Sequence, residues 1–215
     1  MALQKSRFSQ VPQDAVILTE EQALLYYTKI LNNWPKTSDV LGYKYGCGVL
    51  AAASIVSGIY MNSFFRGRFR LLNYGFMSSY LPISAVPATI SMLSHQQFVL
   101  SPLILNIDGC PICLETRASV LQTLTGCIMP LVLAPITSLA LVHRYHTYDM
   151  PYITKEPRKV FQIVSKMYKQ LKGVAWGIFL GQAVIGGLVT YFEANSIINV
   201  NLELVKTERE SEFLS

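Results

Sequence analysis

Four stretches of this chain carry no charged residue and are long enough to cross a membrane as α-helices. They comprise residues 45–65, 74–93, 118–142 and 173–192, and a membrane-spanning helix needs about 20 predominantly apolar residues. All 18 Lys and Arg and all 13 Asp and Glu lie outside these stretches. Helices of a soluble bundle would carry a polar outer face, which these stretches do not supply. The pattern predicts an all-α integral membrane protein with four transmembrane helices.

The second membrane helix is predicted to end near Leu93. The next four residues, Ser94 to Gln97, are all polar and would be costly in lipid without hydrogen-bond partners. Residues 98–107 contain Pro102 and are too few for another crossing. They are therefore predicted to form an interfacial or re-entrant segment.

Amphipathic segments flank the predicted membrane helices. Thr19 and Gln22 have the spacing of a capping box, and apolar residues then recur at helical spacing until Pro35, which predicts a short surface helix. From Pro157 to Lys172 apolar residues gather on one predicted helix face and lysines on the rest. This basic helix is expected to lie on anionic lipid, and docking to a partner subunit is the alternative.

The C-terminal residues 193–215 show a different period. Apolar residues occupy every second position from 198 to 204, which is the period of a β-strand. This acidic tail is predicted either to fray or to add a strand to the sheet of a partner. The chain thus divides into an N-terminal segment with an amphipathic helix (1–44), a four-helix membrane domain (45–192) and the tail.

The distribution of charge predicts an orientation in the membrane and is compatible with a particular cellular compartment. The net charge of +5 is too small and too unevenly placed for a nucleic-acid binder. Ten Lys and Arg lie in residues 66–70 and 143–172, so the positive-inside rule places both termini on the opposite side of the membrane. Lys5 and Arg7 precede any acidic residue, and the N-terminus lacks the apolar core of a secretory signal. This composition is compatible with mitochondrial import.

The predicted membrane helices contain packing residues instead of ionisable ones. Pumps need charged groups at depth, so a proton or ion pathway is disfavoured. Glycines four residues apart let another helix approach closely, whereas prolines remove an amide donor and bend a helix. Packing within the chain is expected, with an intermolecular contact as the alternative. The candidates are Gly42, Gly46, Gly173, Gly177 and Gly181, with Pro82 and Pro87 bending the second helix and Pro130 and Pro135 the third.

Outside the predicted membrane helices, the residues that could carry out chemistry are Cys110 and Cys113, which form a Cys-x-x-Cys pair. A zinc site needs about four ligands. Besides the two cysteines, only His95 is predicted to lie on the same side of the membrane, which leaves the site one ligand short. No metal and no cofactor is therefore expected. A structural disulfide or two spare thiols is favoured over a redox pair. Cys47 and Cys127 each lie alone in an apolar helix.

Several motifs of the chain together resemble those of a known family. They are the segment from Asn62 to Arg66, the segment from Leu81 to Pro87, Cys110 and Cys113 followed by Thr116 and Arg117, and Pro130 to Pro135 followed by Arg144 and Tyr145. In their order and spacing the chain resembles the transmembrane protein 126 family, from about residue 45 to residue 176. The resemblance implies a protein of the mitochondrial inner membrane that helps to assemble respiratory complex I, and it supplies no catalytic residues.

The sequence and this resemblance together predict a non-enzymatic, multi-pass assembly factor that holds membrane-arm intermediates of complex I. The expected partners are membrane-arm subunits, other assembly factors and anionic lipid of the inner membrane. The alternative is a quinone-linked membrane thiol oxidoreductase that uses Cys110 and Cys113. A channel or carrier is disfavoured because no polar lining is expected from the predicted helices.

Overall fold

The computed structural model describes residues 18–105, 110–151 and 156–214, and in these ranges the chain forms helices and no strand. Lys5 and Arg7, on which compatibility with mitochondrial import rests, lie outside the described residues. The α-helices are α1 (Glu20–Asn32), α2 (Leu41–Arg68), α3 (Phe76–His95), α4 (Ser101–Leu105), α5 (Pro111–Thr123), α6 (Met129–Tyr145) and α7 (Pro157–Leu214).

Short turns of other helical types join some of these helices into longer rods. A 3₁₀ turn precedes α2, and π-helical turns join α3 to α4 at Gln96–Leu100 and α5 to α6 at Leu124–Ile128. Within the described residues, four rods are long and apolar enough to cross a membrane. They are Thr37–Arg68, Phe76–Leu105, Pro111–Tyr145 and Pro157–Thr207, which confirms the prediction of an all-helical protein with four membrane helices.

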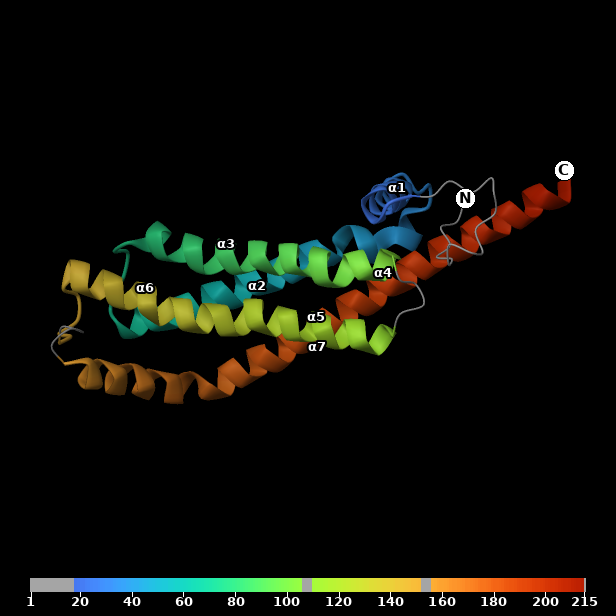
Figure 1. Cartoon of the computed structure of the whole chain (residues 1–215). Coiled ribbons are helices and arrows are strands. Elements are labelled where there is room, and N and C mark those ends of the chain that lie inside the picture. The colour runs from blue at the N-terminus through green and yellow to red at the C-terminus, as the bar shows by residue number, and fades with distance from the viewer. Residues whose placement is uncertain (1–17, 106–109, 152–155, 215) are drawn as a thin grey trace.

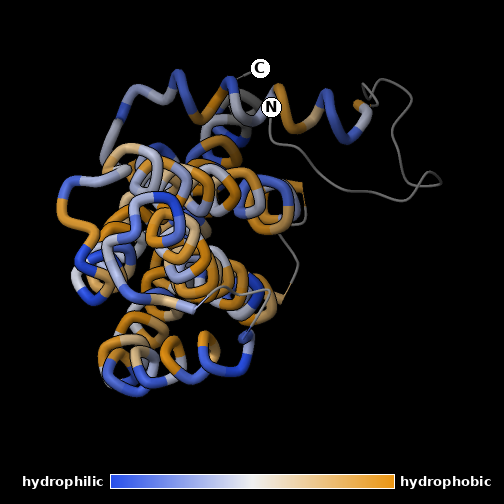
Figure 2. The backbone as a smooth tube through the Cα atoms, turned by 90° about the vertical axis from the view of Figure 1, so that its left-hand side faces the viewer, coloured by the Kyte–Doolittle hydropathy of each residue, from blue (hydrophilic) through white to orange (hydrophobic). Residues whose placement is uncertain are grey.

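The four rods run side by side, with α2 in contact with α3, α6 and α7. Helix α7 begins beside α6, bends, and then crosses the bundle towards the end at which α1 lies (Figure 1). Helix α1 lies across that end, roughly perpendicular to the rods, in both views (Figures 1 and 2). Residues 66–70, the end of α6 and the start of α7, which carry several Lys and Arg residues, lie together at the opposite end.

Both the core and the outer surface of the bundle are apolar. Large apolar side chains on all four rods are exposed on the surface of the bundle, among them Val56, Leu81, Val132 and Leu188. Such a continuous apolar surface would be unusual on a soluble monomer. It is the surface expected of helices surrounded by lipid, where every backbone polar group is satisfied within the helix.

Helix α1 confirms the predicted surface helix and its capping box. The Gln22 amide donates to Thr19 Oγ1 at 3.4 Å, and the Thr19 amide donates to Gln22 Oε1 at 3.1 Å. Tyr27 and Leu31 are fully buried on the side that packs against α4 and α7. This burial raises the pKa of Tyr27 to about 12, with a smaller contribution from the neighbouring Tyr26.

The predicted end of the second membrane helix near Leu93 is wrong. The rod continues through His95 and the π-helical turn to Leu105, so residues 98–105 are not a separate re-entrant segment. Within the polar residues 94–97, His95 is buried and contacts Glu193 of α7, whereas Gln96 and Gln97 are exposed. The partner that removes the cost lies 98 residues away in the chain.

The basic segment at the start of α7 turns most of its apolar face towards the bundle and not outwards. Met167 and Leu171 are buried in the core that also contains Phe65 of α2 and Leu141 of α6. Because α7 runs beside α6 here, the bundle covers Met167 and Leu171, whereas contact of the segment with anionic lipid or with a partner subunit stays a prediction. The lysines of the segment stay exposed.

Of the two alternatives for residues 198–204, neither the frayed tail nor the added β-strand is correct, because α7 runs without a break to Leu214. Glu193, Ile197 and Val200 are buried on one side of this helix. Their spacing of four and three residues is the helical period, and it coexists in the sequence with the alternation that suggested a strand. Burial against α1 and α4 decides between the two periods.

Candidate functional site

A cluster of uncharged polar side chains ties the four rods together inside the bundle. The Gln122 amide nitrogen of α5 donates to Gln182 Oε1 of α7 at 2.7 Å and to Ser54 Oγ of α2 at 3.1 Å. Ser91 of α3 donates to Gln122 Oε1 at 2.6 Å. Because every rod contributes a side chain, the cluster fixes the relative depth of the rods.

A second polar contact joins the α3 and α7 rods nearer the end that carries α1. His95 Nε2 lies 2.7 Å from Glu193 Oε2, and the two side chains are 3% and 0% exposed. Glu193 Oε1 has no hydrogen-bond partner among the described residues. Glu193 directly follows the charge-free stretch 173–192 and is buried in the continuing helix, so the buried ionisable group lies just beyond the stretch that the sequence delimits.

Arg66 forms the corresponding polar contact at the basic end of the bundle. Its guanidinium donates to Ser79 Oγ at 2.8 Å, and to the carbonyls of Leu72 and Tyr74 at 2.7 and 3.0 Å. These bonds satisfy the buried charge and hold the connection between α2 and α3. Arg66 therefore acts within the fold and is not one of the charges that face an aqueous partner.

The packing prolines create a second kind of contact between helices. In a helix, proline leaves the carbonyl four residues earlier without its amide donor. For Pro130 this carbonyl belongs to Gly126, and the Ser57 hydroxyl of α2 donates to it. A neighbouring helix thus supplies the hydrogen bond that proline removes, as membrane helices require.

Pro135 inside α6 shows the same arrangement. The carbonyl it leaves free is that of Leu131, and the Tyr168 hydroxyl of α7 donates to it at 2.8 Å. The two contacts tie α6 and the turn before it to α2 on one side and α7 on the other. The prolines therefore provide acceptors for interhelical hydrogen bonds, a role that the sequence analysis did not assign to them.

Pro82 and Pro87 lie inside α3. The carbonyl that Pro87 leaves free, Ile83, faces Gly58 of α2 so closely that a Cβ on this glycine would lie 2.6 Å from the oxygen. Gly58 was not singled out in the sequence. The proline spacing alone could have pointed to Ile83, but only the fold shows which residue meets it.

The predicted glycine surfaces separate into two groups. Gly42 and Gly46 lie against α7, where a Cβ would come within 2.4 Å of the Phe192 carbonyl and 2.3 Å of Glu193 Oε1. Apart from the adjacent backbone of α7 itself and the neighbouring residues, no described atom lies within 4 Å of the Cβ position at Gly173, Gly177 or Gly181. The first group thus packs within the chain, whereas the second forms an open stripe, and the internal packing expected of it is absent from the described structure.

The cysteine pair lies at the start of a helix and not in the middle of a loop. Cys110 is the N-cap of α5, Pro111 follows it, and Cys113 lies in the first turn. Both thiols are free and exposed. The pKa of the Cys110 thiol is lowered, chiefly by a hydrogen bond from the Cys113 side chain. No group of three or more potential metal ligands occurs in the described part of the chain.

The sequence analysis did not identify Gln122 and Gln182, although both carry the same signal of an interior position. Gln122 and Gln182 are uncharged and so do not interrupt a charge-free stretch, yet a glutamine amide in hydrocarbon is costly without a partner. That cost predicts a partner for each amide. It does not identify the partner, because Gln122 and Gln182 are separated by 60 residues in the chain.

Comparison with known proteins places these features in a family context. A family model described as Transmembrane protein 126 matches residues 22–207. A Transmembrane protein 126 of Drosophila melanogaster is 37% identical over 213 residues, which cover 99% of this chain and 94% of that protein. Transmembrane protein 126A of Rattus norvegicus is 30% identical over 110 residues, covering 50% of this chain and 55% of that protein. No solved structure matches the chain at a significant level.

Proposed function

This chain belongs to the transmembrane protein 126 family, and we propose that it is a non-enzymatic assembly factor of the mitochondrial inner membrane. Its clients in this proposal are unassembled membrane-arm subunits of respiratory complex I, which it holds together with other assembly factors. The family resemblance supports the compartment and the client. The multi-pass helical architecture supports action within the membrane.

The observation that carries the proposal is the open glycine stripe of α7. Gly173, Gly177 and Gly181 recur every fourth residue, and the described chain leaves the space beside them empty. Without side chains at these positions, a foreign transmembrane helix can approach the α7 backbone closely. The glycines of α2 are already covered by this chain's own helices, so they do not offer the same surface.

A complementation experiment tests both the role and the surface. A cell line lacking the protein is expected to accumulate membrane-arm intermediates on native gels, and the wild-type protein should restore complex I. Gly177→Leu should fail to restore it at a normal protein level, because the side chain blocks close approach. Gly48→Leu is the matched control, since Gly48 also faces open space but belongs to α2.

Several outcomes would contradict the proposal. Normal complex I in the deletion line would exclude the assembly role. Equal rescue by both leucine variants would exclude the stripe as the client surface. Fractionation of mitochondria, followed by carbonate washing of the inner membrane, tests the compartment. Release of the intact protein by carbonate would contradict integration into the membrane.

A second candidate function rests on the position of the cysteine pair. Cys110 at a helix N-cap, with Cys113 one turn later, has the arrangement that favours a reactive thiolate. A quinone-linked thiol oxidoreductase would oxidise a substrate dithiol to a disulfide through this pair, and the two electrons and two protons would reduce a quinone to a quinol. Full rescue of the deletion line by a Cys110→Ser and Cys113→Ser double variant would exclude this function.

A further inference from the structure

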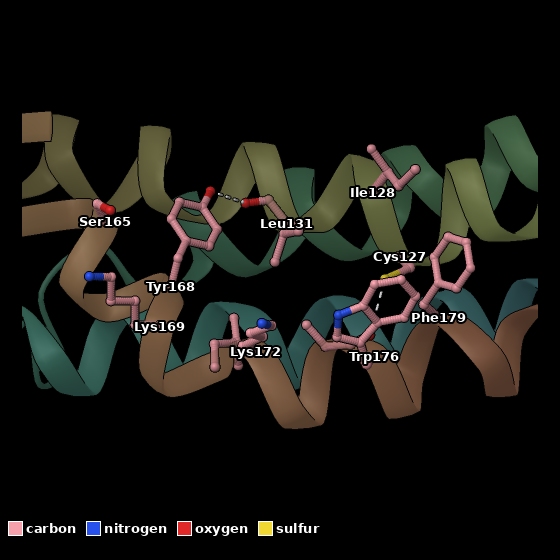
Figure 3. A pocket seen from close by; sticks show the side chains of 11 residues that line it. Cys127, Ile128, Leu131, Ser165, Tyr168, Lys169, Lys172, Trp176 and Phe179 are labelled. Carbon is pink, nitrogen blue, oxygen red and sulfur yellow. Dashed lines mark hydrogen bonds between the residues drawn. The ribbon is translucent and has the colours of Figure 1, made fainter.

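A groove of about 490 Å³ opens between α6 and the basic first part of α7. Its α7 wall extends from Ser165 to Phe179, a rise of about 21 Å at 1.5 Å per residue. Figure 3 shows Lys169 and Ser165 towards one end of the groove and Trp176 and Phe179 towards the other. The lining residues are Cys127, Ile128, Leu131, Ser165, Tyr168, Lys169, Leu171, Lys172, Ala175, Trp176 and Phe179.

The deep part of the groove is apolar and its walls are held in place. Tyr168 donates to the Leu131 carbonyl at 2.8 Å, which fixes its ring across the gap between the two helices (Figure 3). Trp176 is 57% exposed and has an edge contact with Phe179, with ring centroids 5.5 Å apart. The groove therefore presents fixed aromatic and aliphatic surfaces to whatever surrounds the bundle.

The charged part of the groove consists of Lys169 and Lys172. Both side chains are exposed, and neither forms an ion pair with an acidic residue in the described part of the chain. Lys172 directly precedes the charge-free stretch that begins at residue 173. That stretch is long enough to cross the hydrocarbon layer, and long lysine side chains next to the end of such a stretch extend towards the headgroups. Trp176, one turn further along α7, lies where interfacial tryptophans are common.

We propose that this groove binds an anionic phospholipid. One acyl chain lies along the apolar walls, and the phosphate lies between the ammonium groups of Lys169 and Lys172. Charge complementarity favours this occupant over a client helix, because an apolar helix would leave both ammonium groups without a counter-charge. The inference depends on the groove and its lysines and is independent of the proposed role in complex I assembly.

Fluorescence quenching in vesicles tests the site directly. The chain has two tryptophans, so a Trp34→Phe background leaves Trp176 as the sole reporter. The protein is reconstituted in phosphatidylcholine vesicles, and brominated phosphatidylglycerol or brominated phosphatidylcholine is titrated in at constant total lipid. Phosphatidylglycerol should quench Trp176 at a lower mole fraction than phosphatidylcholine does.

Two double variants distinguish lipid binding in the groove from attraction by the overall positive charge of the segment. Lys169→Gln with Lys172→Gln should weaken the preference for phosphatidylglycerol roughly 10- to 30-fold, as expected for the loss of two lysines near an anionic headgroup. Lys159→Gln with Lys166→Gln removes the same charge from the same helix outside the groove and should leave the preference almost unchanged. Circular dichroism and gel filtration establish that both variants fold.

Three results would overturn the proposal. An equal loss of preference in the two double variants would show that the whole basic segment attracts the lipid without a specific site. Equal quenching of the wild-type protein by both lipids would exclude recognition of the headgroup. Protection of Trp176 from both lipids would show that a protein segment or a second copy of the chain covers the groove.

Discussion

Replacement of Tyr168 by Phe removes one hydroxyl and tests whether a side chain of α7 compensates for Pro135. The hydroxyl donates at 2.8 Å to the Leu131 carbonyl, the acceptor that Pro135 leaves without its helical amide donor. Interhelical hydrogen bonds in membrane proteins contribute about 0.6 kcal/mol on average and about 1.7 kcal/mol at most. We expect Tyr168→Phe to lower the free energy of unfolding by an amount in this range.

A double-mutant cycle with Pro135→Ala isolates the contribution of this bond. Alanine at position 135 returns an amide donor to the helix, so the Leu131 carbonyl no longer depends on Tyr168. The Tyr168→Phe change should then cost close to zero in the Pro135→Ala background. The free energy of unfolding is measured in mixed micelles by titration with a denaturing detergent, followed by circular dichroism.

The outcome that refutes this reasoning is an equal cost of Tyr168→Phe in both backgrounds. The hydroxyl would then stabilise the protein independently of the proline. A matched cycle with Ser57→Ala and Pro130→Ala examines the other compensated carbonyl, at Gly126. The two cycles should give the same sign of coupling, because the chemistry at the two prolines is the same.

Three further predictions concern the glycines, the buried carboxyl and the cysteines. Gly42→Ala should destabilise the bundle by about 1–3 kcal/mol through overpacking, because its Cβ would lie 2.4 Å from a backbone carbonyl; thermal unfolding of the detergent-solubilised protein measures this. Glu193→Ala should cost about 1–3 kcal/mol, since its buried histidine partner loses its hydrogen bond, and Glu193→Gln should cost less in the same assay. The lowered pKa of Cys110 increases the thiolate fraction at neutral pH, so Cys113→Ala should move the alkylation profile of Cys110 to higher pH, as followed by mass spectrometry.

Each of these predictions has its own control. Gly48→Ala places a Cβ in open space and should be neutral or slightly stabilising, so an equal loss at Gly42 and Gly48 would contradict the close contact. Equal costs of Ala and Gln at Glu193 would show that the hydrogen bond contributes nothing. An unchanged alkylation profile in Cys113→Ala would show that the Cys113 side chain does not stabilise the Cys110 thiolate.

The pattern of charged and apolar residues was sufficient to identify the class of the protein and its membrane helices. This follows because hydrocarbon admits neither charged groups nor unpaired backbone polar groups, so a membrane helix must appear as a long charge-free run. The capping box at Thr19 could also be predicted from the sequence, since both of its partners lie within one helical turn. Local chemistry was sufficient for each of these features.

The tertiary structure decided where helices end and which polar groups meet. His95 could remain inside a helix only because Glu193 lies beside it, and the strand-like residues 198–204 became helical because one helical face is buried. Likewise, Gly42 packs against α7 while Gly177 faces open space, although the two have similar local sequence patterns. The cost of a polar group or a glycine in lipid is set by the residue that lies opposite, and that residue is fixed only when the helices pack.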